Sequence, residues 1–179
     1  MYNFKSRYRR VAGMRRSFDG LEPQIAPDAY VDETAVVIGD VVVESQASVW
    51  PNVTLRGDHG RIVVGERANV QDNAVCHEHA VIESGATVGH GAIVHDATVE
   101  SGALVGMNAT VLDGALIGSG AAVAAGSVVT PGTTVEPSTL VAGVPAEPLG
   151  DVGDEGLART ADRYVERARK HRETSVRLE

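Results

Sequence analysis

Three histidines, His77, His90 and His95, lie close together near the middle of the chain and could bind a metal ion. Neutral imidazole nitrogens are common zinc ligands, and a tetrahedral zinc ion needs each of them at about 2.0–2.1 Å. Whether the three side chains can converge on one point depends on the elements that carry them. The spacing of the surrounding residues therefore has to be considered next.

The surrounding sequence repeats with a period of six residues. Aliphatic residues, or the thiol of Cys76, recur at every sixth position, with one step of nine after Leu55 and one step of five after Val94. Twenty uncharged positions form this series: Ile25, Val31, Val37, Val43, Val49, Leu55, Val64, Val70, Cys76, Ile82, Val88, Val94, Val99, Val105, Val111, Ile117, Val123, Val129, Val135 and Val141. A six-residue aliphatic period is typical of a parallel β-helix in which three hexads form one triangular coil. The sequence therefore predicts an all-β solenoid of roughly six to seven coils.

In such a coil, residues eighteen apart lie one above the other, about 4.8 Å apart as in neighbouring strands. His77 and His95 are eighteen apart and are expected to stack on one face, whereas His90 is expected on the preceding face, round a corner. One chain therefore cannot easily supply all three ligands, but a second copy could present its His90 face to the other two. Contacts between unlike faces must close into a ring. We therefore expect a homotrimer with metal sites between subunits.

The chain is expected to have three parts. Residues 1–18 form a basic N-terminal arm without a fold of its own, the alternatives being a transit peptide or an anion-binding tail. Residues 19–149 form the β-helix. Residues 150–179 contain an amphipathic α-helix that packs along the outside of the prism, after a linker rich in proline and glycine over residues 143–150.

Composition narrows the classes of function. The net charge is −8, and the basic residues are concentrated before Asp19, so the body of the chain is strongly acidic, which argues against nucleic-acid binding. The single cysteine leaves no internal disulfide and suits a reducing compartment. No apolar run approaches the roughly 20 residues of a membrane span, and no signal-peptide hydrophobic region is seen. We expect a cytoplasmic protein without nucleic-acid or membrane partners.

Several motifs in combination resemble the γ-class carbonic anhydrases and their close relatives. They are Leu55-Arg56-Gly57-Asp58, Gln71-Asp72, Cys76-His77, the segment Val88–His95, Gly106-Met107, Val111–Gly114 and Ala124–Gly132. The resemblance implies a left-handed parallel β-helix and a trimer that hydrates carbon dioxide reversibly to bicarbonate. It also implies Zn²⁺, or else Fe²⁺ or Co²⁺, held by His77 and His95 of one subunit and His90 of its neighbour. Three neutral imidazoles leave a fourth position for water, and zinc lowers the pKa of that water to about 7.

The resemblance implies roles for further residues. The counterpart of Gln71 hydrogen-bonds near the metal-bound hydroxide. Arg56, Asp58 and Asp72 resemble residues that tie the subunits together through ion pairs, a role that suits the planar arginine fork.

The sequence departs from the best-studied active type at the proton relay. His59 stands where an acid follows the Arg-Gly-Asp motif, and no insertion after His77 supplies the second relay glutamate. His59, Glu78 or His79 could substitute, and an imidazole, which ordinarily titrates near pH 6.5, suits proton transfer at neutral pH. His59 lies in the step of nine, which is expected to bulge outward as a surface loop.

Two other functions suit the same fold. A hexapeptide-repeat acyltransferase, or an acyl-CoA or carnitine-related enzyme, would use one basic histidine between subunits and has no need of a three-histidine metal site. A metal-binding scaffold with weak turnover would be consistent with the missing relay acids. Metal content distinguishes the transferase from the others, and a carbon dioxide hydration assay distinguishes the anhydrase from the scaffold.

Overall fold

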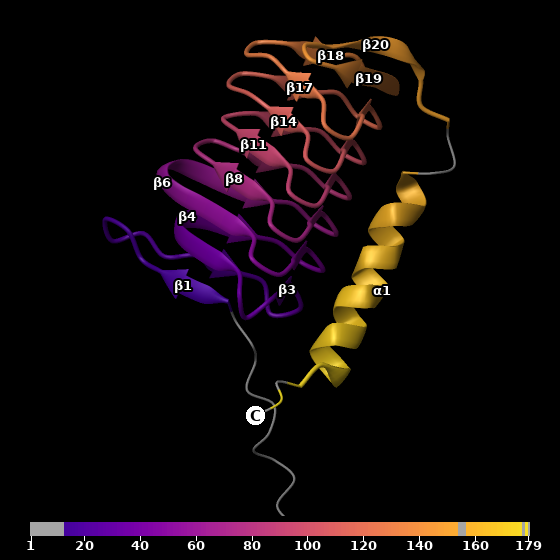
Figure 1. Cartoon of the computed structure of the whole chain (residues 1–179). Coiled ribbons are helices and arrows are strands. Elements are labelled where there is room, and N and C mark those ends of the chain that lie inside the picture. The colour runs from indigo at the N-terminus through magenta and orange to yellow at the C-terminus, as the bar shows by residue number, and fades with distance from the viewer. Residues whose placement is uncertain (1–12, 154–156, 177, 179) are drawn as a thin grey trace, which may run out of the picture.

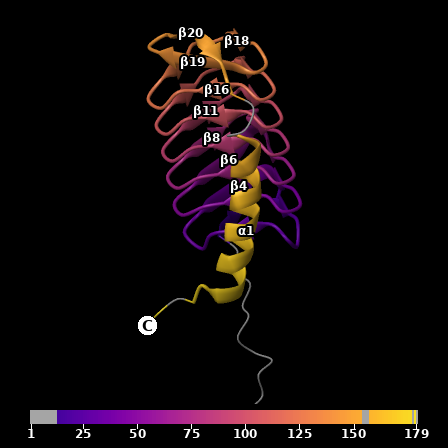
Figure 2. The same ribbon diagram turned by 90° about the vertical axis from the view of Figure 1, so that its right-hand side faces the viewer.

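A computed structural model describes residues 13–153, 157–176 and 178 of the chain. The strands wind into a stack of coils, and one helix, α1 (Ala158–Thr174), lies along the outside of the stack (Figure 1). The helix runs back from the C-terminal coils toward the N-terminal coils, crossing several of them (Figure 2). The chain is thus a left-handed parallel β-helix of about seven turns with a C-terminal helix, which confirms the predicted fold class.

Most strands have only two or three residues, because each hexad contributes one short strand and one turn. Their bounds are β1 Met14–Arg16, β2 Gln24–Ile25, β3 Tyr30–Val31, β4 Val36–Val43, β5 Ser48–Val49, β6 Thr54–Val64, β7 Asn69–Val70, β8 Val75–His77, β9 Val81–Ile82, β10 Thr87–Val88, β11 Ile93–His95, β12 Thr98–Val99, β13 Leu104–Val105, β14 Thr110–Val111, β15 Leu116–Ile117, β16 Ala122–Val123, β17 Val128–Val129, β18 Thr134–Val135, β19 Thr139–Gly143 and β20 Ala146–Asp151.

Hydrogen bonds join these strands into two sheets that enclose a three-sided prism. One sheet, in the order β20-β19-β16-β13-β10-β7-β5-β3, makes one face. The other, in the order β17-β14-β11-β8-β6-β9-β12-β15-β18, makes the remaining two faces. It spans two faces because the long strand β6 pairs with β8 at one end and with β9 at the other.

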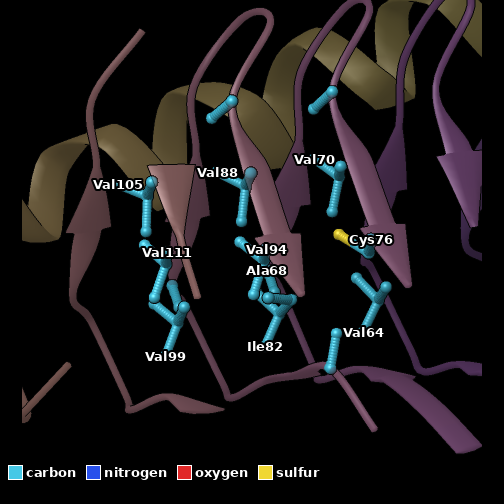
Figure 3. Close-up of a cluster of buried hydrophobic side chains, with 14 of the residues drawn as sticks. Val64, Ala68, Val70, Cys76, Ile82, Val88, Val94, Val99, Val105 and Val111 are labelled. Atoms are coloured by element: carbon cyan, nitrogen blue, oxygen red, sulfur yellow. The ribbon is translucent and has the colours of Figure 1, made fainter. Parts of the chain in front are cut away.

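The interior of the prism is lined by small and β-branched residues. Nineteen of the twenty predicted inward positions are buried, and only Ile25, near the N-terminal end, is partly exposed. Residues of successive coils stack in columns (Figure 3): Val70–Val88–Val105, Cys76–Val94–Val111 and Val64–Ile82–Val99. Aromatic residues make up only 4% of the chain, which agrees with so narrow a core.

The step of nine lies within one strand and not in a loop between strands, although four of its residues bulge out of the strand register. Those residues belong to the continuous strand β6, which pairs in parallel with β4 of the preceding coil. A Cβ on Gly57 would lie 2.4 Å from the carbonyl oxygen of Asp40, so the two strands touch at this point and only glycine fits. Beyond it, β6 carries residues 58–61 opposite the single residue Asp40, whose carboxylate accepts from Arg61 Nε at 3.1 Å. Backbone pairing with β4 holds the residues on either side, 54–57 and 62–64, and residues 58–61 form a bulge between them.

Both ends of the solenoid extend beyond the predicted boundaries at residues 19 and 149. Met14–Arg16 form β1, which pairs in parallel with β4, so part of the predicted arm is strand; residues 1–12 lie outside the described part of the chain. At the other end, most of the predicted linker is β20, which turns back antiparallel on β19. This antiparallel strand covers the last coil and provides the cap that a stack of parallel coils requires.

The helix α1 docks on the prism through a small aromatic cluster. Tyr164 and His171 of the helix lie against Trp50, with ring centroids 5.4 and 5.2 Å away, and His171 also lies against Tyr30. Such distances are typical of aromatic pairs in protein cores. The helix therefore packs along the outside of the prism, as the sequence predicts, although it is shorter than residues 150–179. Within the described residues, no helix is both long and apolar enough to cross a membrane.

Candidate metal centre

Two of the three candidate ligands stack as the eighteen-residue spacing predicts. Strands β8 and β11 pair in register, with His77 opposite His95. The preceding residues, Cys76 and Val94, point into the core, so both imidazoles leave the prism on its outer surface. His77 Nδ1 lies 3.1 Å from His95 Nε2, and the ring centroids are 5.0 Å apart. Two nitrogens held at about 2.0–2.1 Å by a tetrahedral zinc ion would be about 3.4 Å apart.

Two carboxylates determine which nitrogen of each ring carries the proton. Asp58 Oδ1 lies 3.1 Å from His77 Nε2, and Asp113 Oδ1 lies 2.7 Å from His95 Nδ1. An ionised carboxylate can only accept, so these two ring nitrogens donate, and the facing nitrogens of the neutral rings carry lone pairs. Two lone pairs cannot hydrogen-bond to each other, whereas both can bind one cation. The donor set therefore fits a metal ion, in the carboxylate–histidine–metal arrangement typical of zinc proteins.

Arg56 and Asp58 support this pair of histidines from strand β6. Arg56 Nη1 donates to Asp58 Oδ2 at 2.7 Å, and Arg56 Nη2 lies 3.2 Å from His77 Nδ1. Arginine can only donate, which agrees with a lone pair on His77 Nδ1. Burial raises the pKa of Asp58, but hydrogen bonds from Arg56 and His77 outweigh it and hold that pKa below its usual value. Asp58 therefore stays ionised, as its role as acceptor requires.

Cys76 belongs to the core and not to the site. Its side chain is completely buried, and burial raises the pKa of the thiol to about 12. The thiolate, which is the form that binds metals, is therefore absent at neutral pH.

His90 lies apart from the stacked pair, as the face-counting argument predicts. Among the described residues, the groups of close potential ligands around His77 and His95 do not include it. It follows β10, and its Nδ1 lies 2.9 Å from Asp72 Oδ2. Gln71 lies on the same face, where its Nε2 donates to Asn69 Oδ1 at 3.0 Å.

His90 and Gln71 also line a groove of about 440 Å³ between the coils and α1, together with Met107 and Tyr164. The stacked histidines and His90 thus lie on two faces of the prism. That neighbouring subunits bring these two faces together stays a prediction.

Two of the three candidates for proton transfer, His59 and Glu78, lie near the stacked histidines. The His59 ring is exposed on β6, with its centroid 6.2 Å from that of His77. Glu78 Oε1 lies 4.0 Å from His95 Nε2. Their roles in catalysis, and the roles of Arg56, Asp58 and Asp72 between subunits, stay predictions.

Sequence reasoning missed Asp113 and the contact of Asp58 with a histidine ring. Asp113 lies eighteen residues after His95, and Asp72 lies eighteen residues before His90. Asp72 therefore occupies the same column as His90, and the spacing rule that pairs His77 with His95 would have found it. Asp113 is one residue out of the column of His95, because the step of five after Val94 pairs Ile93 with Thr110 and Val94 with Val111.

No model of a protein family matches the chain. Over 61 residues, 34% of its length, the chain is 44% identical to the carnitine operon protein CaiE of Citrobacter koseri, covering 31% of that protein. Over a segment of the same length it is 39% identical to a carbonic anhydrase of Geobacillus kaustophilus, covering 34% of that protein. The matched segment spans about a third of the length of these curated relatives.

Solved structures match much more of the chain. A hexapeptide transferase family protein from Anaplasma phagocytophilum superimposes with a TM-score of 0.87 at 36% identity, over 88% of this chain and 98% of that one. A candidate acetyltransferase from Bacillus cereus gives a TM-score of 0.87 at 33% identity, over 90% of this chain and 98% of that one. The chain therefore belongs to the hexapeptide-repeat family of transferase-like and γ-class carbonic anhydrase-like proteins.

Proposed function

We propose that this protein hydrates carbon dioxide reversibly to bicarbonate, with a metal ion held between the subunits of a homotrimer. The observation that carries the proposal is the pair of facing nitrogens, His77 Nδ1 and His95 Nε2, 3.1 Å apart. Asp58 and Asp113 fix the protons of both rings on the opposite nitrogens. Two lone pairs that face each other at this distance can bind one metal ion, which would replace the contact of Arg56 Nη2 with His77 Nδ1.

The third ligand in this proposal is His90 of a neighbouring copy. Asp72 accepts from His90 Nδ1, which leaves Nε2 of that imidazole as the free ligand atom. Three imidazoles suit Zn²⁺, and also Fe²⁺ or Co²⁺. When bound, such an ion supplies Lewis acidity and an activated water at neutral pH.

The residues of this chain then have separate tasks. Asp58 and Asp113 orient the two stacked rings. Gln71 accompanies His90 on the opposing face and offers an amide near the reacting oxygen. His59 and Glu78 are the groups placed to carry a proton away from the site, and the carbonic anhydrase relative from Geobacillus kaustophilus supports this class of reaction.

The proposal is tested by stopped-flow measurement of carbon dioxide hydration on protein loaded with Zn²⁺ and, separately, with Fe²⁺ under anaerobic conditions. We expect hydration well above the buffer rate with at least one metal. His95→Ala should lose the activity and the metal held by the stacked histidines. Glu136→Gln, which removes an exposed acid from a distant coil, is the control. Full metal occupancy without hydration would instead indicate a metal-binding scaffold.

A second candidate, acyl transfer, is favoured by the acetyltransferase-like neighbour from Bacillus cereus and by the groove beside α1. In this alternative His90, hydrogen-bonded to Asp72, acts as the general base for an acceptor bound in the groove. Turnover of acetyl-CoA by metal-free protein, abolished in His90→Ala but retained in His95→Ala, would support it. The anhydrase proposal instead expects that metal-free protein does not turn over acetyl-CoA. It also expects that carbon dioxide hydration requires both His90 and His95.

A further inference from the structure

We propose that Glu78, His79 and Asp96 form a second divalent-cation site next to the stacked histidines. One ligand atom from each of the three lies within 4.8 Å of the others. One imidazole nitrogen and two carboxylate oxygens suit Zn²⁺, Mn²⁺ or Co²⁺, with water completing the shell. The inference goes beyond the proposed function and does not depend on it, because the site uses none of the three histidines assigned there.

The step of five in the hexapeptide series builds the corner that carries this site. Between the paired strands β8–β11 and β9–β12, one coil has Glu78, His79 and Ala80, whereas the next has only Asp96 and Ala97. The shorter coil therefore places Asp96 opposite both Glu78 and His79. Glu78 and Asp96 also have φ values of 58° and 44°, a left-handed conformation that residues other than glycine rarely adopt.

Gly60 fixes the orientation of the His79 ring. A Cβ on Gly60 would lie 2.6 Å from Cδ2 and Nε2 of His79 and 2.7 Å from Cε1, so the imidazole packs directly on the glycine backbone. These three atoms face β6, and the remaining nitrogen, Nδ1, lies 3.4 Å from Asp96 Oδ1. Gly60 is one of the extra residues in the β6 extension. The extension therefore aims one nitrogen of an otherwise exposed histidine at the carboxylates.

The local charge also favours a cation. Neighbouring acids have basic partners: Asp40 pairs with Arg61, and Asp58 pairs with Arg56. In the part of the chain that the structure describes, the ion pairs of Glu78 and Asp96 join them only to histidines. Two carboxylates without an arginine or lysine leave a concentrated negative charge, which a divalent cation would neutralise.

Glu78 connects the two sites. It belongs to the group with His79 and Asp96 and also to the group with His77 and His95. A cation in the second site would therefore lie next to the first site and share one carboxylate with it. That cation would compete with any role of Glu78 as a proton carrier.

The test is a titration of metal-free wild-type protein with Zn²⁺ alone, in competition with a chromophoric chelator. We expect two equivalents per chain. His79→Ala and Asp96→Asn should each bind one equivalent of Zn²⁺ at the stacked histidines, with the affinity of the tighter wild-type site. His95→Ala should retain only the equivalent bound by Glu78, His79 and Asp96. Gly60→Ala removes no ligand but displaces the His79 ring, and it should weaken the second equivalent about 10–100-fold. Gly153→Ala, where a Cβ meets open space, is the matched control.

The outcomes separate this inference from the proposed function. One equivalent in the wild type, lost in His95→Ala and unaffected by Asp96→Asn, would overturn the second site and leave the first intact. One equivalent lost in Asp96→Asn and retained in His95→Ala would support the second site and contradict the first. Two equivalents that persist in both His79→Ala and Asp96→Asn would also overturn the inference. Circular dichroism and size-exclusion chromatography establish that each variant is folded, and Asp96→Asn, which preserves side-chain shape, is the decisive variant.

Discussion

Removing the carboxylate of Asp113 should weaken metal binding without disturbing the fold. Asp113 Oδ1 accepts from His95 Nδ1 at 2.7 Å, a short, charge-assisted hydrogen bond that keeps the lone pair on Nε2. Loss of such an outer partner typically lowers metal affinity 10–100-fold. The Asp113 side chain is 57% exposed, so solvent screens part of the interaction. We therefore expect the lower end of the range for Asp113→Ala, about tenfold or roughly 1.4 kcal/mol.

The measurement is the zinc dissociation constant, from competition with a chromophoric chelator at fixed pH and ionic strength. Asp113→Asn keeps an oxygen that can accept from Nδ1–H, so its affinity should fall between that of the wild type and that of Asp113→Ala. Glu136→Gln removes the same charge from an exposed position on a later coil and should leave the affinity unchanged. If Asp113→Ala matched Glu136→Gln within about twofold, Asp113 would not orient His95.

Four further predictions concern the remaining residues of the site. His90→Ala should lose metal from every site between subunits while its circular dichroism stays that of a β-helix, because the buried aliphatic columns do not depend on the metal. Full zinc occupancy of these sites would contradict the site assignment. Arg56→Ala should shift trimer toward monomer in dilute size-exclusion runs, because the resemblance assigns Arg56 to ion pairs between subunits. A trimer that only loses catalysis would place Arg56 at the metal instead. His59→Ala should slow carbon dioxide hydration in dilute buffer, and added imidazole should restore much of the rate. If the hydration rate depended on buffer concentration as in the wild type, His59 would have no part in proton transfer. The pKa of Asp58 is lowered from 3.8 in the folded protein, so its contacts stabilise the fold above pH 3.8 and this stabilisation is lost as the pH falls through the lower pKa of the folded state. Acid unfolding followed by circular dichroism should therefore lack this pH-dependent contribution in Asp58→Asn. An acid transition identical to that of the wild type would argue against it.

The hexapeptide period predicts the coils because burial in a narrow prism restricts each inward position to a small set of residues. Val70, Val88 and Val105 show the result, stacking in one column as their spacing requires (Figure 3). The β6 extension is not predictable in the same way. Its polar, glycine-containing residues 58–61 resemble a loop, and only the pairing of β4 with the residues on either side makes them a bulge within one strand. The antiparallel strand β20 is not predictable from the sequence for a similar reason, since its proline and glycine suit a linker when the partner strand is not known.

The contacts of the candidate site can be separated in the same way, into those that the period predicts and those that it does not. The eighteen-residue column rule brings His77 to His95 and also accounts for the contact of Asp72 with His90. It does not account for the contact of Asp113 with His95, because the step of five shifts the register between β11 and β14 by one residue. The contact between Gly60 and His79 depends on how far β6 extends, which the period does not encode. Local periodicity therefore predicts contacts within a column, and contacts across a corner require the structure.

The sharing of each site between two subunits is tested most directly by mixing two inactive variants. His90→Ala supplies an intact His77–His95 face, and His95→Ala supplies an intact His90 face. When the two are unfolded together and refolded in equal amounts, every mixed trimer should contain one complete site, which amounts to about a quarter of the wild-type sites. We expect zinc binding at the sites between subunits and carbon dioxide hydration to recover to about that level, although each variant refolded alone lacks both. If mixed trimers form and recover neither metal nor activity, the metal is not held between His77 and His95 of one subunit and His90 of the next.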